Sequence, residues 1–271
     1  MIRFDNQVIV ITGAGRGLGA AYARLIGSRG GRVVVHDAGV GRDGLGSDAG
    51  PANSVVDEIV SNGGNASAEI QNLADKEGCE TLISNVLAAQ GRIDGLIHSA
   101  GVVFYKTIAE TTDDEWEIQR KISIDAPFWL CRAAWPAMER QGYGRIVLTA
   151  SGYGLAPWEG NDVTAYGVGK AAQFGLMNGL AGEGMGKNIM ANVISPVAAT
   201  RIFRAEVGPD QFSADSVAPA VTVLASDQCP FTGKVVRAAG GKFSVGQLES
   251  AGEIELETYP SPEQFLSALD K

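Results

Sequence analysis

The sequence has few of the residues that build disulfide frameworks or metal sites. Its three cysteines, Cys79, Cys131 and Cys229, are far apart, and none has a metal-ligating neighbour at a useful spacing. An odd number of scattered cysteines does not suggest a disulfide framework. We therefore expect buried thiols in a reducing compartment, no metal ion and a cytoplasmic location.

Long apolar runs and an excess of basic residues are also missing. No apolar stretch reaches the roughly 18 residues of a membrane-spanning helix. The net charge is −9, and both nucleic acids and anionic membranes favour basic surfaces. We therefore expect neither as a partner. Residues 1–15 enter a strand pattern at once and the chain ends in ALDK, so we expect neither a signal peptide nor a peroxisomal address.

Apolar β-branched runs alternate with amphipathic segments of helix length. The expected strands are Val8–Thr12, Arg32–Asp37, Ser67–Asn72, Asp94–Ser99, Arg145–Ser151, Met190–Ser195 and Lys234–Ala238. The expected helices lie near residues 18–29, 51–62, 76–90, 113–140, 163–182 and 214–226. This alternation predicts one doubly wound, Rossmann-like α/β domain over residues 1–271, with a seven-stranded parallel sheet.

Three regions depart from plain alternation. Residues 38–50 form an insertion rich in Gly and Asp, and residues 197–213 form a long connection after the sixth strand. We expect a C-terminal extension at about 241–271, which contains the alternating stretch 252–258. Ser261 and Pro262 are expected to begin a short closing helix there.

A glycine-rich turn follows the first strand. Its spacing, Gly13-x-x-x-Gly17-x-Gly19, differs from the common G-x-G-x-x-G, and a helix is expected directly after it. Glycines let the backbone approach a pyrophosphate, and a helix N-terminus offers free N–H groups to it. In a strand–turn–helix unit this turn indicates a dinucleotide site, although a tight turn without a ligand is the alternative.

The second strand ends at His36 and Asp37. A carboxylate there accepts hydrogen bonds from the adenosine ribose and repels a 2′-phosphate, so Asp37 favours NAD(H) over NADP(H). Arg16, a basic residue inside the glycine turn, favours the opposite choice. We give more weight to Asp37, and the alternative for it is a solvated carboxylate at a strand end.

A tyrosine and a lysine lie one helical turn apart at Tyr166 and Lys170. A nearby cation stabilises a phenolate, so we expect Lys170 to lower the pKa of Tyr166 and make it an acid and base for an alcohol or ketone. Ser151 ends the fifth expected strand, at the sheet edge where ligands bind. A surface pair is the alternative for Tyr166 and Lys170 alone, but the serine and the glycine turn make the combination specific.

Together these residues resemble the short-chain dehydrogenase/reductase family over nearly the whole chain. The resemblance implies Ser151, Tyr166 and Lys170 as catalytic residues, and Lys170 also as a ligand of the nicotinamide ribose. The implied cofactor contacts are Gly13, Gly15, Arg16, Gly17, Leu18, Gly19, Asp37, Asn72, Leu73, Ser99, Ala100, Gly101, Tyr166, Lys170, Pro196, Ala198 and Thr200.

Within that family, four stretches resemble the dehydrogenase domain of peroxisomal multifunctional enzyme type 2. They are RFDNQVIVITGAGRGLGAAYA, HDAGVGRDG, CRAAWPAMERQGYGRIV and residues 196–201. That branch includes (3R)-hydroxyacyl-CoA dehydrogenases and 17β-hydroxysteroid dehydrogenases. The resemblance implies a bulky apolar substrate, which we expect residues 197–213 to close over.

Three positions depart from the family pattern. Asn72 stands where the family often has Asp, His98 where it often has Asn, and Ser123 where it usually has an Asn that holds a water in a proton relay. We expect Ser123 to keep the relay with a shifted water. The alternative is that Ser123 only bonds a helix carbonyl.

The sequence therefore predicts an NAD-dependent oxidoreductase that interconverts a secondary alcohol and a ketone. The substrate is a 3-hydroxyacyl-CoA, a hydroxysteroid or another hydrophobic ketone, and the rival is a non-catalytic dinucleotide-binding sensor. Glycines at 167, 169, 175, 179, 182 and 184 suggest close helix packing between subunits, so we expect a homodimer or homotetramer.

Overall fold

The computed structural model describes residues 1–41, 44–160, 162–200, 212–249 and 261–269. Within these ranges eight strands form one sheet, in the order β3-β2-β1-β4-β5-β6-β7-β8. The strands are β1 (Val8–Thr12), β2 (Arg32–His36), β3 (Asn65–Glu69), β4 (Gly95–His98), β5 (Gly144–Thr149), β6 (Ile189–Val197), β7 (Val235–Ala239) and β8 (Lys242–Gly246). The first seven are parallel, which confirms the predicted sheet, and β8 adds an antiparallel edge strand.

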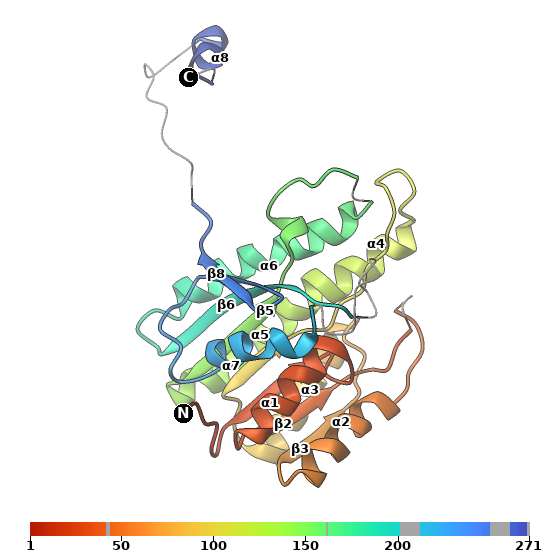
Figure 1. Ribbon diagram of the computed structural model, residues 1–271, viewed down its shortest axis with the longest axis vertical. Coiled ribbons are helices and arrows are strands. Elements are labelled where there is room, and N and C mark those ends of the chain that lie inside the picture. The colour runs from red at the N-terminus through yellow and green to blue at the C-terminus, as the bar shows by residue number, and fades with distance from the viewer. Residues whose placement is uncertain (42–43, 161, 201–211, 250–260, 270–271) are drawn as a thin grey trace.

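Helices cover both faces of this sheet (Figure 1). They are α1 (Gly17–Ser28), α2 (Gly50–Ser61), α3 (Lys76–Gln90), α4 (Asp113–Arg120), α5 (Ala126–Gln141), α6 (Thr164–Glu183), α7 (Ala218–Leu224) and α8 (Pro262–Leu269). Buried residues of α1, α2 and α7 form one apolar cluster with the sheet, and those of α3, α5 and α6 form a second. The two clusters are the two sides of a doubly wound fold, and α8 lies apart from them (Figure 1).

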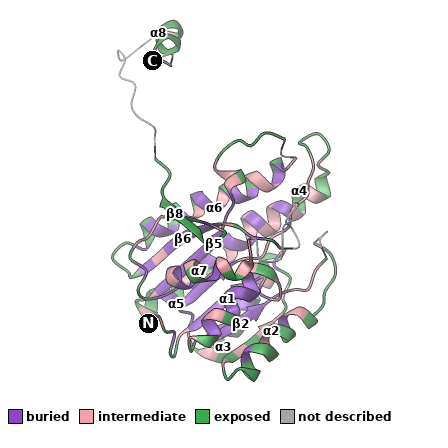
Figure 2. Ribbon diagram, in the orientation of Figure 1, coloured by how far each residue is buried: buried purple, intermediate pink, exposed green. Residues whose placement is uncertain are grey.

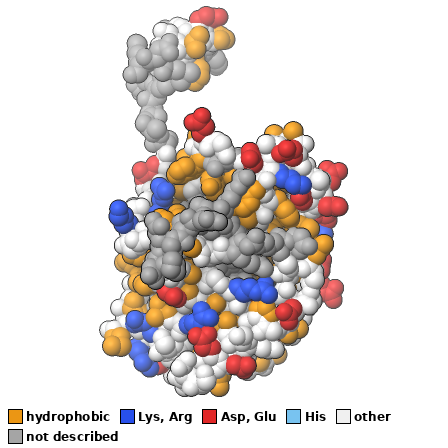
Figure 3. Space-filling model, turned by 45° about the vertical axis from the view of Figure 1, so that its right-hand side comes forward, with side chains coloured by type: hydrophobic (Ala, Val, Ile, Leu, Met, Phe, Trp, Pro, Cys, Tyr) orange, Lys and Arg blue, Asp and Glu red, His pale blue; other side chains and the backbone are white. Residues whose placement is uncertain are grey.

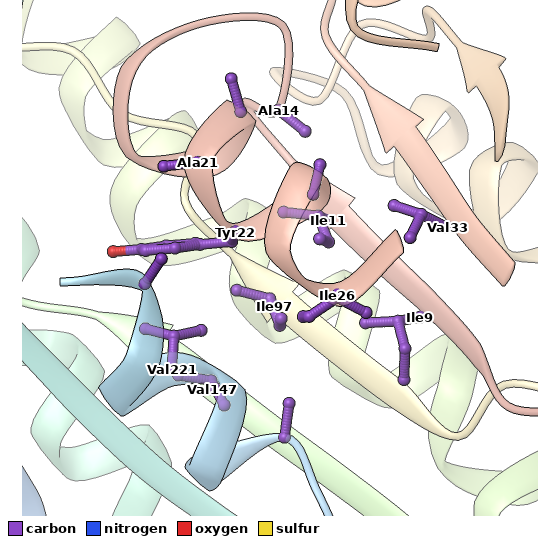
Figure 4. Close-up of a cluster of buried hydrophobic side chains, with 14 of the residues drawn as sticks. Ile9, Ile11, Ala14, Ala21, Tyr22, Ile26, Val33, Ile97, Val147 and Val221 are labelled. Carbon is purple, nitrogen blue, oxygen red and sulfur yellow. The ribbon is translucent and has the colours of Figure 1, made fainter. Parts of the chain in front are cut away.

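The strands near the middle of the sheet are buried along their whole length (Figure 2). Figure 4 shows how Tyr22 and Ile26 of α1 lie over Ile9 and Ile11 of β1, with Val221 of α7 beside them. Each fully buried side chain of this size contributes roughly 1.5–3 kcal/mol to folding. This packing fixes the end of β1, and with it the start of the glycine turn.

The predicted helix over 113–140 is interrupted in the structure. Its capping box of Thr112 and Glu115 is confirmed, but residues Lys121–Asp125 form a π-helical turn between α4 and α5. The N–H of Ala126 bonds the carbonyl of Lys121, five residues back, instead of that of Ile122. Pro127 has no backbone N–H that could donate to the Ser123 carbonyl. The π turn therefore frees backbone carbonyls beside Ser123.

Other boundaries also differ from the sequence prediction. The third strand was predicted at 67–72 but lies at Asn65–Glu69, where it pairs in register with β2 as an edge strand of polar residues. The second and fifth strands stop before Asp37 and Ser151, so both residues lie in the loops beyond the sheet. The predicted cap of the closing helix is confirmed, because the Ser261 hydroxyl accepts a hydrogen bond from the Gln264 N–H. The alternating stretch 252–258 lies outside the described residues.

Candidate active site

A groove opens at the carboxyl edge of the sheet, where β1 lies between β2 and β4. The chain places β2 and β3 on one side of β1 and then crosses to β4 on the other side. Doubly wound folds bind ligands at such a switch point. The lining brings together most of the predicted cofactor contacts, which are Gly13, Arg16, Gly17, Leu18, Gly19, Asp37, Asn72, Leu73, Ser99, Ala100, Gly101 and Thr200. Segments from five parts of the chain thus line one groove.

The glycine positions of this turn have little or no room for side chains. A Cβ on Gly13 would lie 2.7 Å from the backbone of Ala100, and one on Gly19 would lie 2.3 Å from the carbonyl of Gly13. Gly17 has a φ of +53°, in the left-handed region. Arg16 precedes α1 without a side-chain cap, so the first N–H groups of the helix stay open to the groove. This cradle fits the pyrophosphate of a dinucleotide.

The carboxylate of Asp37 lines the groove. One of its oxygens accepts a hydrogen bond from Gly15 N–H at 3.0 Å, and the other from Gly39 N–H at 2.8 Å. These bonds fix the carboxylate, which still has lone pairs for ribose hydroxyls. Arg16 also lines the groove, and its guanidinium donates to the Val40 carbonyl at 3.3 Å.

His98 connects the cofactor groove to the π turn. Its Nε2 lies 3.2 Å from the carbonyl of Ile122, one of those that the π turn frees. A carbonyl only accepts, so Nε2 carries the proton and Nδ1 accepts from the Thr12 hydroxyl at 2.9 Å. Burial lowers the pKa of His98 to about 3 and keeps the ring neutral. Thr12 in turn accepts from the N–H groups of Ser99 and Ala100.

Asn72 lines the groove, but its side chain is engaged locally. Its amide donates to Asp75 at 3.0 Å and accepts from Ala74 N–H at 3.0 Å. The side chain therefore shapes the turn that leads into α3.

A second cavity, of about 620 Å³, contains the predicted catalytic residues. Tyr166 and Lys170 come from α6, and Ser151 from the loop after β5. The Lys170 ammonium lies 5.5 Å from the centre of the Tyr166 ring and donates to the Thr149 carbonyl at 2.7 Å. Ser151 and Tyr166 are joined by a hydrogen bond. The cavity shares Leu18, Ser99, Gly101 and Thr200 with the cofactor groove, so the two are continuous.

Burial sets the protonation of this centre. It raises the pKa of Tyr166 to about 12, and the hydrogen bond from Ser151 only partly offsets that rise. Burial also lowers the pKa of Lys170 to about 8. The expectation that Lys170 lowers the pKa of Tyr166 below its usual value is therefore wrong for this geometry, because burial raises that pKa. Near neutral pH the centre holds a phenol beside an ammonium.

Ser123 is buried in the π turn, behind α6. Its hydroxyl accepts from the Gln119 amide at 2.6 Å, and its carbonyl accepts from the Gln173 amide at 3.3 Å. The Oε1 atoms of both glutamines are buried without a hydrogen-bond partner, and buried polar atoms of this kind commonly bind water. The role of Ser123 in a proton relay stays a prediction, as do the roles of the other site residues.

Pro196 and Ala198 also line the catalytic cavity, with Thr200, at the end of β6. The predicted closing segment 197–213 lies largely at residues 201–211, outside the described residues. Its two described ends are joined, because Ala199 N–H donates to the Phe212 carbonyl at 2.7 Å.

Sequence reasoning missed several lining residues. They include Tyr153 and Trp158 between the catalytic serine and tyrosine, and Arg237, Lys242 and Phe243 of β7 and β8. A signal for β8 was present, because Gly240 and Gly241 between two extended runs are typical of a two-residue hairpin. Both have positive φ, +53° and +78°, as a type I′ turn requires.

Residues 7–208 match the short chain dehydrogenase family. The chain belongs to this family. It is therefore an oxidoreductase of the type that acts on CH–OH groups with NAD(P)(H). In the part of the chain that the structure describes, no helix could cross a membrane.

Individual relatives agree with this assignment. The chain is 36% identical to a short-chain type dehydrogenase/reductase of Mycobacterium tuberculosis, over 88% of this chain and 84% of that protein. It is 36% identical to peroxisomal multifunctional enzyme type 2 of Mus musculus, over 90% of this chain but only 32% of that enzyme. A metagenomic short-chain oxidoreductase in complex with NADP is 30% identical and superposes with a TM-score of 0.72, over 84% of this chain and 95% of that one.

Proposed function

We propose that the protein interconverts a bulky, apolar secondary alcohol and its ketone with NAD(H). The observation that supports this most is the continuity of two sites. The cavity with Ser151, Tyr166 and Lys170 opens into the glycine-rich groove through shared lining residues. A substrate carbonyl in the cavity would therefore lie beside a cofactor bound in the groove.

Ser151, Tyr166 and Lys170 each have a separate role in the proposed proton transfer. In the direction of reduction, Ser151 holds the carbonyl oxygen and Tyr166 gives it the phenolic proton. A bound nicotinamide cofactor supplies the hydride, which goes to the carbonyl carbon. The Tyr166 O–H bond breaks, the O–H bond of the alcohol forms, and the phenolate left behind is stabilised by the Lys170 ammonium. Solvent then returns a proton to Tyr166, and oxidation is the reverse.

The preference for NAD(H) is a separate part of the proposal. Asp37 lines the groove and is held in place by two backbone N–H groups, and its charge there opposes a 2′-phosphate. The NADP complex of a structural neighbour shows that the family also accepts the phosphorylated cofactor. Arg16 is the residue of this chain that would favour it.

The size and lining of the cavity support a large substrate. Tyr153, Trp158 and Phe243 line it and keep 40%, 53% and 50% of their surface exposed. The rings of Tyr153 and Trp158 offer apolar surface there, which suits the 3-hydroxyacyl-CoA or hydroxysteroid that the resemblance implies. We also propose that residues 1–271 act as one domain in a homodimer or homotetramer in the cytoplasm. Cys79, Cys131 and Cys229 are free and buried, as predicted.

A turnover assay tests the proposal. NADH oxidation is followed with 3-oxoacyl thioesters, ketosteroids and small polar ketones, and Ser151→Ala serves as the matched variant. We expect turnover with a bulky ketone, and a loss of about 10²–10⁴-fold in the variant. NADH binding without turnover of any carbonyl compound would support the non-catalytic sensor instead.

A further inference from the structure

The catalytic cavity has an unusual charge for this protein. The chain carries 31 acidic and 22 basic residues, and charges of both signs are scattered over the face in Figure 3. Among the described residues that line the cavity there is no Asp or Glu, but there are three cations, Lys170, Arg237 and Lys242. Lys170 belongs to the catalytic centre. The other two come from the β7–β8 hairpin and have no part in the proton chemistry.

Arg237 points to the catalytic side of the sheet. Its neighbours in β7, Val236 and Ala238, belong to the apolar cluster with α1 and α7. Side chains alternate along a strand, so Arg237 faces the opposite side, which α6 covers. It pairs in register with Ser195 of β6, another residue that lines the cavity. The guanidinium therefore lies on the same side of the sheet as Tyr166 and Lys170.

Lys242 lies on the same face of the β7–β8 hairpin as Arg237. Lys242 pairs with Ala239, and paired residues of antiparallel strands point to the same face. Ala239 lies two residues after Arg237 and so shares its face. The Gly240–Gly241 turn therefore places both cations on the same side of the hairpin, at the mouth of the cavity.

Neither cation has a partner within the described chain. Arg237 and Lys242 are both exposed, and neither forms an ion pair or a side-chain hydrogen bond with a described residue. Elsewhere in the described chain eight ion pairs engage other basic residues. The exposed ring of Trp158 also lines the cavity, so these two cations, which have no partner in the described chain, belong to a surface that is apolar and positive at once.

We propose that Arg237 and Lys242 bind an anionic group of the substrate, a carboxylate or a phosphate attached to an apolar chain. The inference rests on the proposed function, because it concerns the same cavity. The phosphates of a cofactor do not account for these cations, since the cradle of Gly13–Gly19 lies in the neighbouring groove. The hairpin would thus select acidic ketones and alcohols over neutral ones of the same length.

The test compares three ligands with one apolar chain, namely octanoate, octyl phosphate and 1-octanol. Their binding to the full-length protein with NADH present is measured by calorimetry. We expect at least one anion to bind about tenfold more tightly than the alcohol, because each exposed ion pair contributes up to about fivefold. Raising the salt from 0.1 M to 1 M should reduce this preference, because the Debye length falls from about 10 Å to 3 Å.

The variant Arg237→Gln/Lys242→Gln should lose the preference and keep its affinity for octanol and NADH. Lys234→Gln, which removes a charge just before β7 but outside the cavity lining, should behave like the parent. Equal affinities of the parent for all three ligands would overturn the proposal, and so would a preference that persists in the double variant. The stronger of the two anions identifies the group as carboxylate or phosphate.

A Tyr166→Phe variant separates this inference from the proposed function, since it should keep the anion preference without turnover. A preference for anions in a protein that reduces no carbonyl compound would support the binding site and reject the catalytic role. Turnover without the preference would reject the binding site alone.

Discussion

Lys170 should make the stability of the protein rise with pH above about 8. Burial lowers its pKa from 10.5 to about 8 in the folded chain, whereas an unfolded chain keeps the usual value. Between these two values the unfolded state binds more protons than the folded state, so the free energy of unfolding increases with pH. Each pH unit in this window contributes about 1.4 kcal/mol.

The perturbation is Lys170→Met, which keeps an unbranched side chain of similar length and removes the charge. The free energy of unfolding of the parent should rise by about 2 kcal/mol relative to the variant between pH 8 and 9.5. Below about pH 7, where Lys170 is protonated in both the folded and the unfolded state, the difference between the two proteins should be constant. Taking this difference cancels the titration of all groups that both proteins share.

Urea unfolding followed by circular dichroism measures this difference at pH 7, 8, 9 and 9.5. All samples need the same protein concentration, because assembly changes the apparent stability. A parent-minus-variant difference that stays flat across the whole range would show that burial does not lower the pKa of Lys170. Lys170 would then have an ordinary pKa, and its environment would be more hydrated than the 3% exposure of the residue implies.

Three further predictions concern the cofactor, the proton path and assembly. Asp37→Ala should narrow the preference for NADH over NADPH in steady-state kinetics, and a parent that prefers NADPH would mean that Arg16 outweighs the carboxylate. Ser123→Ala should lower turnover and change its pH dependence with little change in NADH affinity; an unchanged pH profile would remove Ser123 from the proton path. A Cβ at Gly179 on α6 would have no neighbour within 4 Å in the same subunit, so the position is open to contact with a second subunit. Gly179→Leu should therefore reduce the amount of oligomer seen by light scattering. A monomeric parent at micromolar concentration would contradict assembly.

The sequence was sufficient for the parts of the fold that repeat a simple pattern. β-branched runs such as Val8–Thr12 predicted buried parallel strands, and the structure has them. The edge strand β3 was misplaced because its residues are polar and its register is fixed by pairing with β2. The π turn at Ser123 was missed because it depends on bonds from distant residues, namely His98 and Gln173.

The site was predictable where local spacing carries the chemistry. Tyr166 and Lys170 lie one turn apart on any helix, so their proximity needed no structure. The pKa of Tyr166 was not predictable in this way, because it depends on how many groups exclude water from the phenol. Arg237 and Lys242 were missed because only the pairing of β7 with β8 places them at the cavity.

Replacing Tyr166 with phenylalanine removes the hydroxyl that is proposed to give the proton to the substrate. Reduction of a bulky ketone by NADH is compared in the parent and in Tyr166→Phe, and NADH affinity is measured by cofactor fluorescence. If Tyr166 gives the proton to the substrate oxygen, turnover should fall by about 10²–10⁴-fold while NADH affinity stays close to that of the parent. Near-normal turnover in the variant would show that Tyr166 is not the proton donor.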